Sequence, residues 1–364
     1  MILPEAAGPQ STWAITNLSN IYARLLPVQN EPDGTLYAEL HGPNFVVVTK
    51  SFQHVRLWIL DPQKVDSGIV QSEMSLENPL WLVDPYTQAA LLGLAWVAEP
   101  TRVYCAGLGA GRVPMILHHY LPHTTIDCTE IDPAIVEMAT RFFGLGLDER
   151  MRVHLADGRR WLDDAEPYDL LFVDVFLDRG YVPYWLSTVE FFALCRQKLT
   201  PGGVLVINLL TEDDYLANRV VTLQELFSEL WFCALDEGNT VLFAVNDGPG
   251  QPSLDHEALI QRITARQAVE HFAFPLATLS LALTQDPAKA GIDLAGAHPF
   301  YDATPPDHYF DLLPSFEQLL VPVDPTLPCP CGSGVPYGAC HGKTNSSDPT
   351  DAAPLAEDTP SPSS

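Results

Sequence analysis

Basic residues are scarce in this sequence. Lys and Arg together number 19 against 46 Asp and Glu, which gives a formal net charge of -27 over 364 residues. So acidic a chain repels phosphate backbones and anionic lipid, which argues against nucleic acid as a general partner. The same field attracts a cationic substrate such as a polyamine, although an acidic surface also arises for solubility alone.

Long hydrophobic runs are missing as well. The N-terminal segment has no basic leader and no long apolar stretch, so it resembles neither a signal peptide nor a membrane anchor. We therefore expect a cytoplasmic protein without membrane contact. Cysteine is sparse, and four of the seven lie singly in apolar segments, a pattern typical of buried reduced thiols: Cys105, Cys128, Cys195 and Cys233.

The pattern of hydrophobic residues changes near Pro85. Residues 37–74 contain short alternating or β-branched runs separated by Gly, Pro and Asp, which predicts a small antiparallel β domain. From Pro85 onward, apolar strands alternate with helical segments, which predicts a parallel sheet covered by helices on both faces. After a helix predicted over residues 218–231, residues 232–246 look like an antiparallel hairpin that completes the sheet, so the expected α/β fold is methyltransferase-like and Rossmann-like.

The predicted domain boundaries follow these shifts in composition. The tail is rich in Ser, Pro and acidic residues and is too polar to bury a core. We expect a β domain over 1–84, a methyltransferase-like domain over 85–250, a mixed and partly helical extension over 251–325, a zinc motif over 326–343 and a disordered tail over 344–364.

The stretch YCAGLGAGRVP places Gly107, Gly109 and Gly111 at the carboxyl end of the first predicted parallel strand. Doubly wound sheets bind ligands at this edge, and glycine allows positive φ and close approach of a ligand. Glycine-rich turns also serve tight packing, so the loop alone leaves both explanations open. A dinucleotide loop needs its third glycine where Arg112 stands, and no Gly-Lys-Ser/Thr follows, so an adenosyl cofactor is favoured.

Acidic residues follow the next three predicted strands. Glu130 stands where a carboxylate accepts both ribose hydroxyls. Asp157 can accept from an adenine amino group, with Gly158 permitting close approach. Asp174 faces the reacting end of the cofactor. Asp132, by contrast, has the simpler interpretation of a helix N-cap.

These motifs resemble the spermidine synthase family, whose members place a small β domain before a methyltransferase-like sheet. The resemblance extends over about residues 37–246. The family's glycine loop, EIDP motif, DGR motif and Asp-bearing loop have counterparts at Gly107 to Gly111, Glu130 to Pro133, Asp157 to Arg159, and Asp174.

The resemblance implies a role for each matching residue. Glu130 would hold the ribose, Asp157 the adenine and Asp174 the reacting amine. Gln71 falls on the family's strand ahead of the substrate gate, and Tyr86 falls near its substrate-lining tyrosine.

Two departures from the family pattern stand out. Leu177 replaces a second acid, and Asp178 lies one residue late as a candidate substrate ligand. Thr87 and Gln88 follow Tyr86 where the family has His or Gln and then Glu, so the gate carboxylate is missing. The motifs LVDPYT and DVFLDRGYVPYWL are similar instead to divergent spermidine synthase-like proteins.

The leading hypothesis is a transferase that uses S-adenosylmethionine or its decarboxylated form to move an aminopropyl or related group onto a small-molecule amine. Asp174 would accept a proton from the amine or orient it. Two alternatives stay open: methyl transfer to an unidentified substrate, and a non-catalytic module that docks a protein partner. A homodimer is also left open. Aromatics in the Asp174 loop either wall a pocket or serve ordinary packing: Phe176, Tyr181, Tyr184 and Trp185.

The remaining cysteines cluster in the segment PCPCGSGVPYGACHG. Three thiolates and one imidazole can complete the tetrahedral shell of Zn²⁺, which leaves no open position for catalysis. The segment resembles the SEC-C motif, which implies a structural or partner-binding zinc site. Its predicted ligands are Cys329, Cys331, Cys340 and His341.

Overall fold

The computed structural model describes residues 12–41, 44–60, 69–176, 182–248, 253–306 and 309. The chain divides into two compact units, Met1–Val323 and Asp324–Ser364, and every described residue belongs to the first. The elements are α1 (Thr12–Asn30), β1 (Gly34–His41), β2 (Asn44–Ser51), β3 (His54–Leu60), β4 (Ile69–Ser75), α2 (Pro85–Ala90), η2 (Leu91–Ala95), β5 (Arg102–Ala106), α3 (Arg112–Tyr120), β6 (Thr125–Glu130), α4 (Pro133–Phe142), β7 (Met151–Leu155), α5 (Gly158–Asp164), β8 (Tyr168–Val173), η4 (Tyr184–Leu186), α6 (Val189–Gln197), β9 (Leu199–Leu210), α7 (Leu216–Gln224), β10 (Glu229–Ala234), β11 (Asn239–Val245), α8 (His256–Glu270), α9 (Leu276–Leu279), η5 (Ser280–Ala282) and η6 (Pro287–Ala290).

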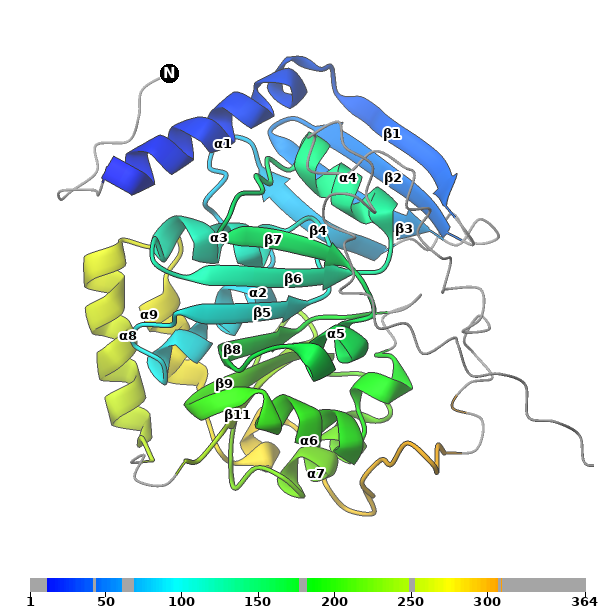
Figure 1. The fold of residues 1–364 in the computed structure, drawn as a ribbon, viewed down its shortest axis with the longest axis vertical. Coiled ribbons are helices and arrows are strands. Elements are labelled where there is room, and N and C mark those ends of the chain that lie inside the picture. The colour runs from blue at the N-terminus through cyan, green and yellow to red at the C-terminus, as the bar shows by residue number, and fades with distance from the viewer. Residues whose placement is uncertain are drawn as a thin grey trace, which may run out of the picture. The chain divides into compact units, whose positions relative to one another are not determined.

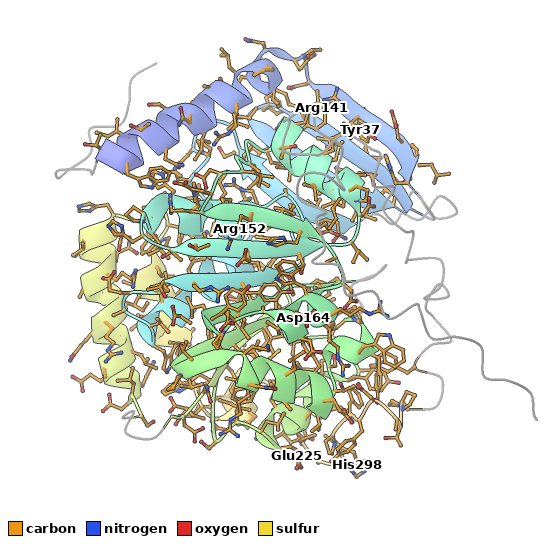
Figure 2. All side chains as sticks on the ribbon, in the orientation of Figure 1. Tyr37, Arg141, Arg152, Asp164, Glu225 and His298 are labelled. Atoms are coloured by element: carbon orange, nitrogen blue, oxygen red, sulfur yellow. The ribbon has the colours of Figure 1, made fainter. Side chains whose placement is uncertain are left out.

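Strands β1 to β4 form the predicted antiparallel sheet, in the order β1-β2-β3-β4. The register shifts between β3 and β4 so that Val70 pairs with Trp58 and Ser72 with Leu57, which leaves Gln71 at a bulge. This sheet packs against α4, where the rings of Tyr37 and Phe142 lie 6.3 Å apart. Figure 2 shows Tyr37 beside α4.

The second sheet has the order β10-β11-β9-β8-β5-β6-β7. Strands β5 to β9 pair in parallel, whereas β11 is antiparallel to both β9 and β10. The predicted fold class, a methyltransferase-like sheet finished by an antiparallel hairpin, is confirmed. In Figure 1 the arrowheads of β5, β6 and β7 end at the same edge.

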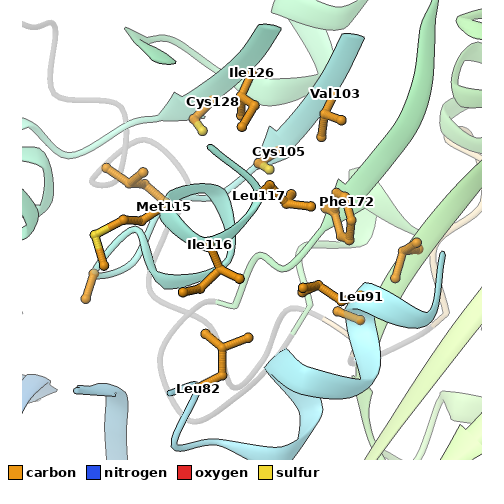
Figure 3. Close-up of a cluster of buried hydrophobic side chains, with 14 of the residues drawn as sticks. Leu82, Leu91, Val103, Cys105, Met115, Ile116, Leu117, Ile126, Cys128 and Phe172 are labelled. Carbon is orange, nitrogen blue, oxygen red and sulfur yellow. The ribbon is translucent and has the colours of Figure 1, made fainter. Parts of the chain in front are cut away.

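Apolar side chains alternate between the two faces of this sheet. Val103 and Cys105 of β5 pack with α2, η2, α3 and α8, whereas Tyr104 and Ala106 pack with α5, α6 and α7. Figure 1 shows α8 and α9 on the side away from α6 and α7, and Figure 3 shows Cys105 beside Cys128, next to α3. All four solitary cysteines are buried and free, as predicted.

Local signals set several helix ends. Asp132 caps α4 by accepting from the Ala134 N–H at 2.8 Å, which confirms the predicted N-cap. The helix predicted over residues 218–231 ends early, at Gln224, because Glu229 to Ala234 are used in β10. Within the described residues, no helix is long and apolar enough to cross a membrane.

The first helix, α1, lies within residues 1–84, where the sequence predicts a β domain. Its buried residues Ile21, Leu25 and Val28 are spaced as one helical face. Asn17 joins this face to α3: its Oδ1 lies 3.0 Å from His119 Nδ1. The described residues 256–306 together with Tyr309 are called here the C-terminal extension. The domain boundaries within the first unit stay a prediction.

The buried His119 predicts acid sensitivity. Burial lowers the pKa of His119 to about 4, so the folded protein keeps it neutral while the unfolded chain is protonated below about pH 6.5. The stability contributed by this depressed pKa is present above pH 6.5 and is lost as pH falls toward 4. Denaturant titrations at pH 7 and pH 5 should show a larger loss of unfolding free energy for the wild type than for His119→Gln. Equal losses would contradict this assignment.

Candidate functional site

Four strand ends meet at one edge of the sheet, on both sides of β5. The Gly107 N–H donates to Thr129 O at 3.0 Å, and the Asp174 N–H donates to Ala106 O at 3.1 Å. Since β6 and β8 flank β5, this edge is the point where the strand order changes direction. The residues that follow β5, β6, β7 and β8 therefore converge, as their spacing predicts.

The glycine loop adopts left-handed backbone, with φ of +86° at Gly107, +52° at Gly109 and +70° at Gly111. A Cβ at Gly107 would lie 2.4 Å from the carbonyl oxygen of Asp174, so glycine lets the ends of β5 and β8 touch. A Cβ at Gly111 would meet Leu145 at 3.1 Å. At these two positions the neighbouring protein accounts for glycine.

Glu130 is bound to the same loop. Its Oε2 accepts from the Leu108 N–H at 3.2 Å, and its Oε1 accepts from the Ile131 and Asp132 N–H groups at 2.8 and 3.0 Å. Burial raises its pKa above the usual value. A carboxylate offers roughly four acceptor positions, so Oε2 retains capacity for a donor such as a ribose hydroxyl.

Asp157 has a structural role that its spacing did not reveal. It is the N-cap of α5, and its Oδ1 accepts from the Arg160 N–H at 2.9 Å. This cap does not use Oδ2. A Cβ at Gly158 would meet the Tyr104 hydroxyl at 3.0 Å and Thr129 Oγ1 at 3.1 Å, so glycine here lets α5 approach the sheet.

Asp174 is held from two sides. Asn208 Nδ2 of β9 donates to its Oδ1 at 2.9 Å, and the Tyr86 hydroxyl of α2 donates to the same carboxylate. Burial raises the pKa of Asp174 and raises the pKa of Tyr86 well above 10, so the phenol stays protonated and donates. Asn239 in turn donates to Asn208 at 3.0 Å. The structure thus brings together Asp174 and Tyr86, two of the predicted site residues.

Strand β4 brings the N-terminal antiparallel sheet into contact with the glycine loop. Ser72 Oγ accepts from the Ala110 N–H at 3.1 Å, and a Cβ at Gly109 would meet the same oxygen at 3.0 Å. Gln71 precedes it at the bulge, and bulges commonly redirect a side chain next to functional sites. The N-terminal sheet is therefore part of the candidate site.

Two segments of this chain match known protein families. Residues 92–235 match the Spermine/spermidine synthase domain, and residues 326–343 match the SEC-C motif. The resemblance to spermidine synthases is confirmed. A probable spermidine synthase from Corynebacterium glutamicum superposes with a TM-score of 0.57 at 18% identity, covering 76% of this chain and 98% of that one, and it supports the fold.

Two curated relatives are similar in sequence. The polyamine aminopropyltransferase of Vibrio vulnificus is 31% identical over 181 residues, which cover 48% of this chain and 60% of that protein. The human eEF1A lysine and N-terminal methyltransferase is 31% identical over 184 residues, which cover 45% of this chain and 26% of that protein. The chain thus spans less than two thirds of the length of either relative.

Gln88 stands where the spermidine synthase pattern has the gate carboxylate, and its side chain points into the protein. Gln88 is buried, and its Nε2 donates to Leu82 O at 2.6 Å, so it serves packing. Asp84 instead places a carboxylate beside Tyr86 and Asp174, where it accepts from the Glu73 N–H. Burial, Glu73 and Asp174 raise the pKa of Asp84 to about 6.

Sequence reasoning missed Asp84 and Asn208. Asp84 stands inside the quoted motif LVDPYT, and Asn208 is a buried amide in the otherwise apolar strand β9. Either feature was available as a signal. A buried polar side chain in an apolar run needs a partner, and here that partner is Asp174.

Several predicted site residues lie outside the described residues. Asp178 is one, and the proposed zinc ligands Cys329, Cys331, Cys340 and His341 are the others. Within the described part of the chain, no group of His, Cys, Asp or Glu is arranged to hold a metal ion. The zinc ligand set stays a prediction.

Proposed function

We propose that this chain is a transferase that binds S-adenosylmethionine or its decarboxylated form at the carboxyl edge of β5 to β8 and transfers an aminopropyl or related group to an amine. The position of Asp174 carries the proposal. Its carbonyl lies against the glycine loop, and its carboxylate is fixed by Tyr86 and Asn208. A carboxylate so placed can bind and deprotonate a cationic acceptor next to the donor.

The residues present fit an adenosyl donor. Glu130 keeps acceptor capacity on Oε2 for a ribose hydroxyl, and Asp157 keeps Oδ2 for an exocyclic amino group. When bound, a sulfonium donor supplies an activated carbon and its own leaving group. The protein then has to orient the acceptor and remove one proton.

Asp174 is suited to accept the proton that the acceptor amine loses. Burial raises its pKa above the usual value, which makes its carboxylate a stronger base than an exposed aspartate. Tyr86 and Asn208 donate to it and fix its direction without competing for the proton. Asp84 adds a second negative charge beside Tyr86, so the pair attracts an ammonium group before it loses its proton.

The relatives support an amine as the acceptor. By their names, one acts on polyamines and the other on lysine and N-terminal groups of eEF1A. These acceptors share one chemical feature, an amino group. The second relative also favours a second candidate function, methyl transfer from S-adenosylmethionine to an amine. The carboxylate supplied by Asp84 counts against a purely non-catalytic docking module.

The two candidate functions are separated by the mass of the product. Purified protein is incubated with each sulfonium form and a panel of diamines, polyamines and lysine peptides, and the products are analysed by mass spectrometry. Aminopropyl adducts formed only from the decarboxylated donor support the first function. Methyl adducts formed only from S-adenosylmethionine support the second, and no adduct from either donor contradicts both.

Asp84 predicts a pH-dependent acceptor affinity. Asp84→Asn removes one of two charges facing the acceptor and should raise the acceptor KM by about tenfold, with little change in donor affinity. Because the pKa of Asp84 is about 6, the wild-type KM should rise as pH falls below 6, and the variant should lack this rise. The exposed Asp164→Asn is the matched control. An unchanged acceptor KM in Asp84→Asn would remove Asp84 from the site.

A further inference from the structure

The C-terminal extension continues beyond η6 onto α6 and α7. Asn218 of α7 donates to His298 O at 2.9 Å, and Thr222 Oγ1 accepts from the Phe300 N–H at 3.0 Å. The Val189 N–H at the start of α6 donates to Phe300 O at 2.8 Å. Figure 2 shows His298 at the α7 end of the molecule. This part of the extension is therefore bound along the central domain.

An aromatic cluster fixes the extension to the segment between β8 and α6. The Tyr184 ring lies 5.3 Å from Phe300 and 4.9 Å from Tyr309. The Tyr309 hydroxyl donates to Val182 O at 2.9 Å and accepts from the buried Arg219 guanidinium at 2.9 Å. Tyr184, which the sequence offered as a pocket wall, thus packs against the extension.

A polar contact set centred on Asp302 lies next to this cluster. The Arg159 guanidinium donates to both Asp302 carboxylate oxygens, at 2.9 and 2.6 Å, and Thr188 Oγ1 donates to Oδ1 at 2.7 Å. The Asp302 N–H donates to the Glu190 carboxylate at 2.9 Å. Arg159 also donates to Trp185 O at 2.9 Å. One guanidinium therefore joins α5, the segment before α6 and the extension.

Arg159 follows the α5 N-cap, Asp157, within the first turn of the helix. A bidentate ion pair fixes a guanidinium in direction as well as position, so Asp302 orients Arg159. Both side chains are partly exposed, at 26% for Arg159 and 36% for Asp302, so the pair adds little to folding stability. Its main effect is on the relative geometry of α5, the segment before α6 and the extension, which Arg159 joins.

We propose that Asp302 is a positioning residue for the candidate donor site, acting through Arg159 on Asp157 and on the segment that follows the Asp174 loop. The C-terminal extension then contributes to donor binding through Asp302. The inference goes beyond the proposed function and depends on it only for its ligand readout.

The test measures donor affinity and local order in Asp302→Asn, Arg159→Ala and the double variant. Calorimetry with S-adenosylmethionine and its decarboxylated form should show about tenfold weaker binding in each single variant. The double variant should bind the donor no more weakly than Arg159→Ala does, because both substitutions break the same contact, the ion pair between Arg159 and Asp302. Hydrogen exchange at the Val189 amide should speed up in Asp302→Asn. Asp293→Asn, an exposed change in the same extension, is the control.

Other outcomes discriminate between the two proposals. Wild-type binding with unchanged affinity in Asp302→Asn would overturn the positioning role, even if the variant is less stable. Additive losses in the double variant would also overturn it. Absence of binding by the wild type would contradict the proposed function itself. Asp302→Glu should restore most of the affinity, since it keeps the charge that Arg159 binds.

Discussion

Asp174→Asn is expected to lower the rate of group transfer by about 10²–10⁴-fold, the usual range for loss of a general base. The substitution keeps the shape of the side chain, and an amide oxygen can still accept from Asn208. It removes the charge that binds an ammonium group and the lone pair that takes its proton. Single-turnover rates with saturating donor measure the effect directly.

Donor affinity distinguishes a catalytic role for Asp174 from a structural one. Because Glu130 and Asp157 are left intact, the variant should bind the sulfonium donor as the wild type does. Raising the pH should partly rescue the rate of the variant, since more of the acceptor amine is then deprotonated without a base. A transfer rate within about threefold of the wild type would exclude Asp174 as the base.

Gly107→Ala is expected to be the most disruptive single change in the glycine loop. The new Cβ would lie 2.4 Å from the carbonyl oxygen of Asp174 and 3.2 Å from its carbonyl carbon, and both are backbone atoms rather than the end of a flexible side chain. The strand ends must separate, which displaces Asp174 from Tyr86 and Asn208. We expect a loss of about 2–5 kcal/mol in unfolding free energy, combining overpacking with left-handed strain, together with loss of donor binding.

Gly238→Ala is the matched control for Gly107→Ala. Gly238 also has positive φ, at +94°, but an added Cβ there meets nothing within 4 Å. It should lose only about 1–2 kcal/mol, from the strained backbone conformation. Denaturant titration of both variants isolates the contact with Asp174. Equal losses in the two variants would show that this contact is relaxed at no cost.

Much of the fold was predictable because it rests on local periodicity. The alternation of strands and helices after Pro85 gave the parallel sheet, and the run of β-branched segments before it gave the antiparallel one. Helix α1 was missed because exposed apolar residues, Ile15 and Leu26, lie outside its buried face and blur the helical spacing of its apolar residues. The end of α7 was misplaced because the apolar residues Leu230 and Trp231 fit either a helix or a strand.

The site was only partly predictable. The strand ends could be identified from spacing, since parallel strands bring their carboxyl ends to one edge. The partners of Asp174 could not be found that way, because Tyr86 precedes the sheet and Asn208 follows on another strand. The contact between Arg159 and Asp302 joins residues far apart in the sequence, so no local pattern encodes it.

The glycine residues show the limit of motif reasoning most clearly. Gly107 lies against the Asp174 carbonyl, which leaves no room for a Cβ, and Gly111 has a left-handed φ of +70° beside the Leu145 side chain. Their presence in the motif is therefore compatible with packing as well as with a ligand. Glu130 favours a ligand more strongly than these glycines do, because three backbone N–H groups fix its carboxylate and leave acceptor capacity on it.

The central claim is that the Glu130 carboxylate binds the sulfonium donor, and isothermal titration calorimetry tests it most directly. S-adenosylmethionine and its decarboxylated form are titrated into the wild type and into Glu130→Ala, with folding of both checked by circular dichroism. We predict saturable binding of at least one donor by the wild type, weakened at least about tenfold in the variant. No binding of either donor by the folded wild type, or equal binding by Glu130→Ala, would contradict the account.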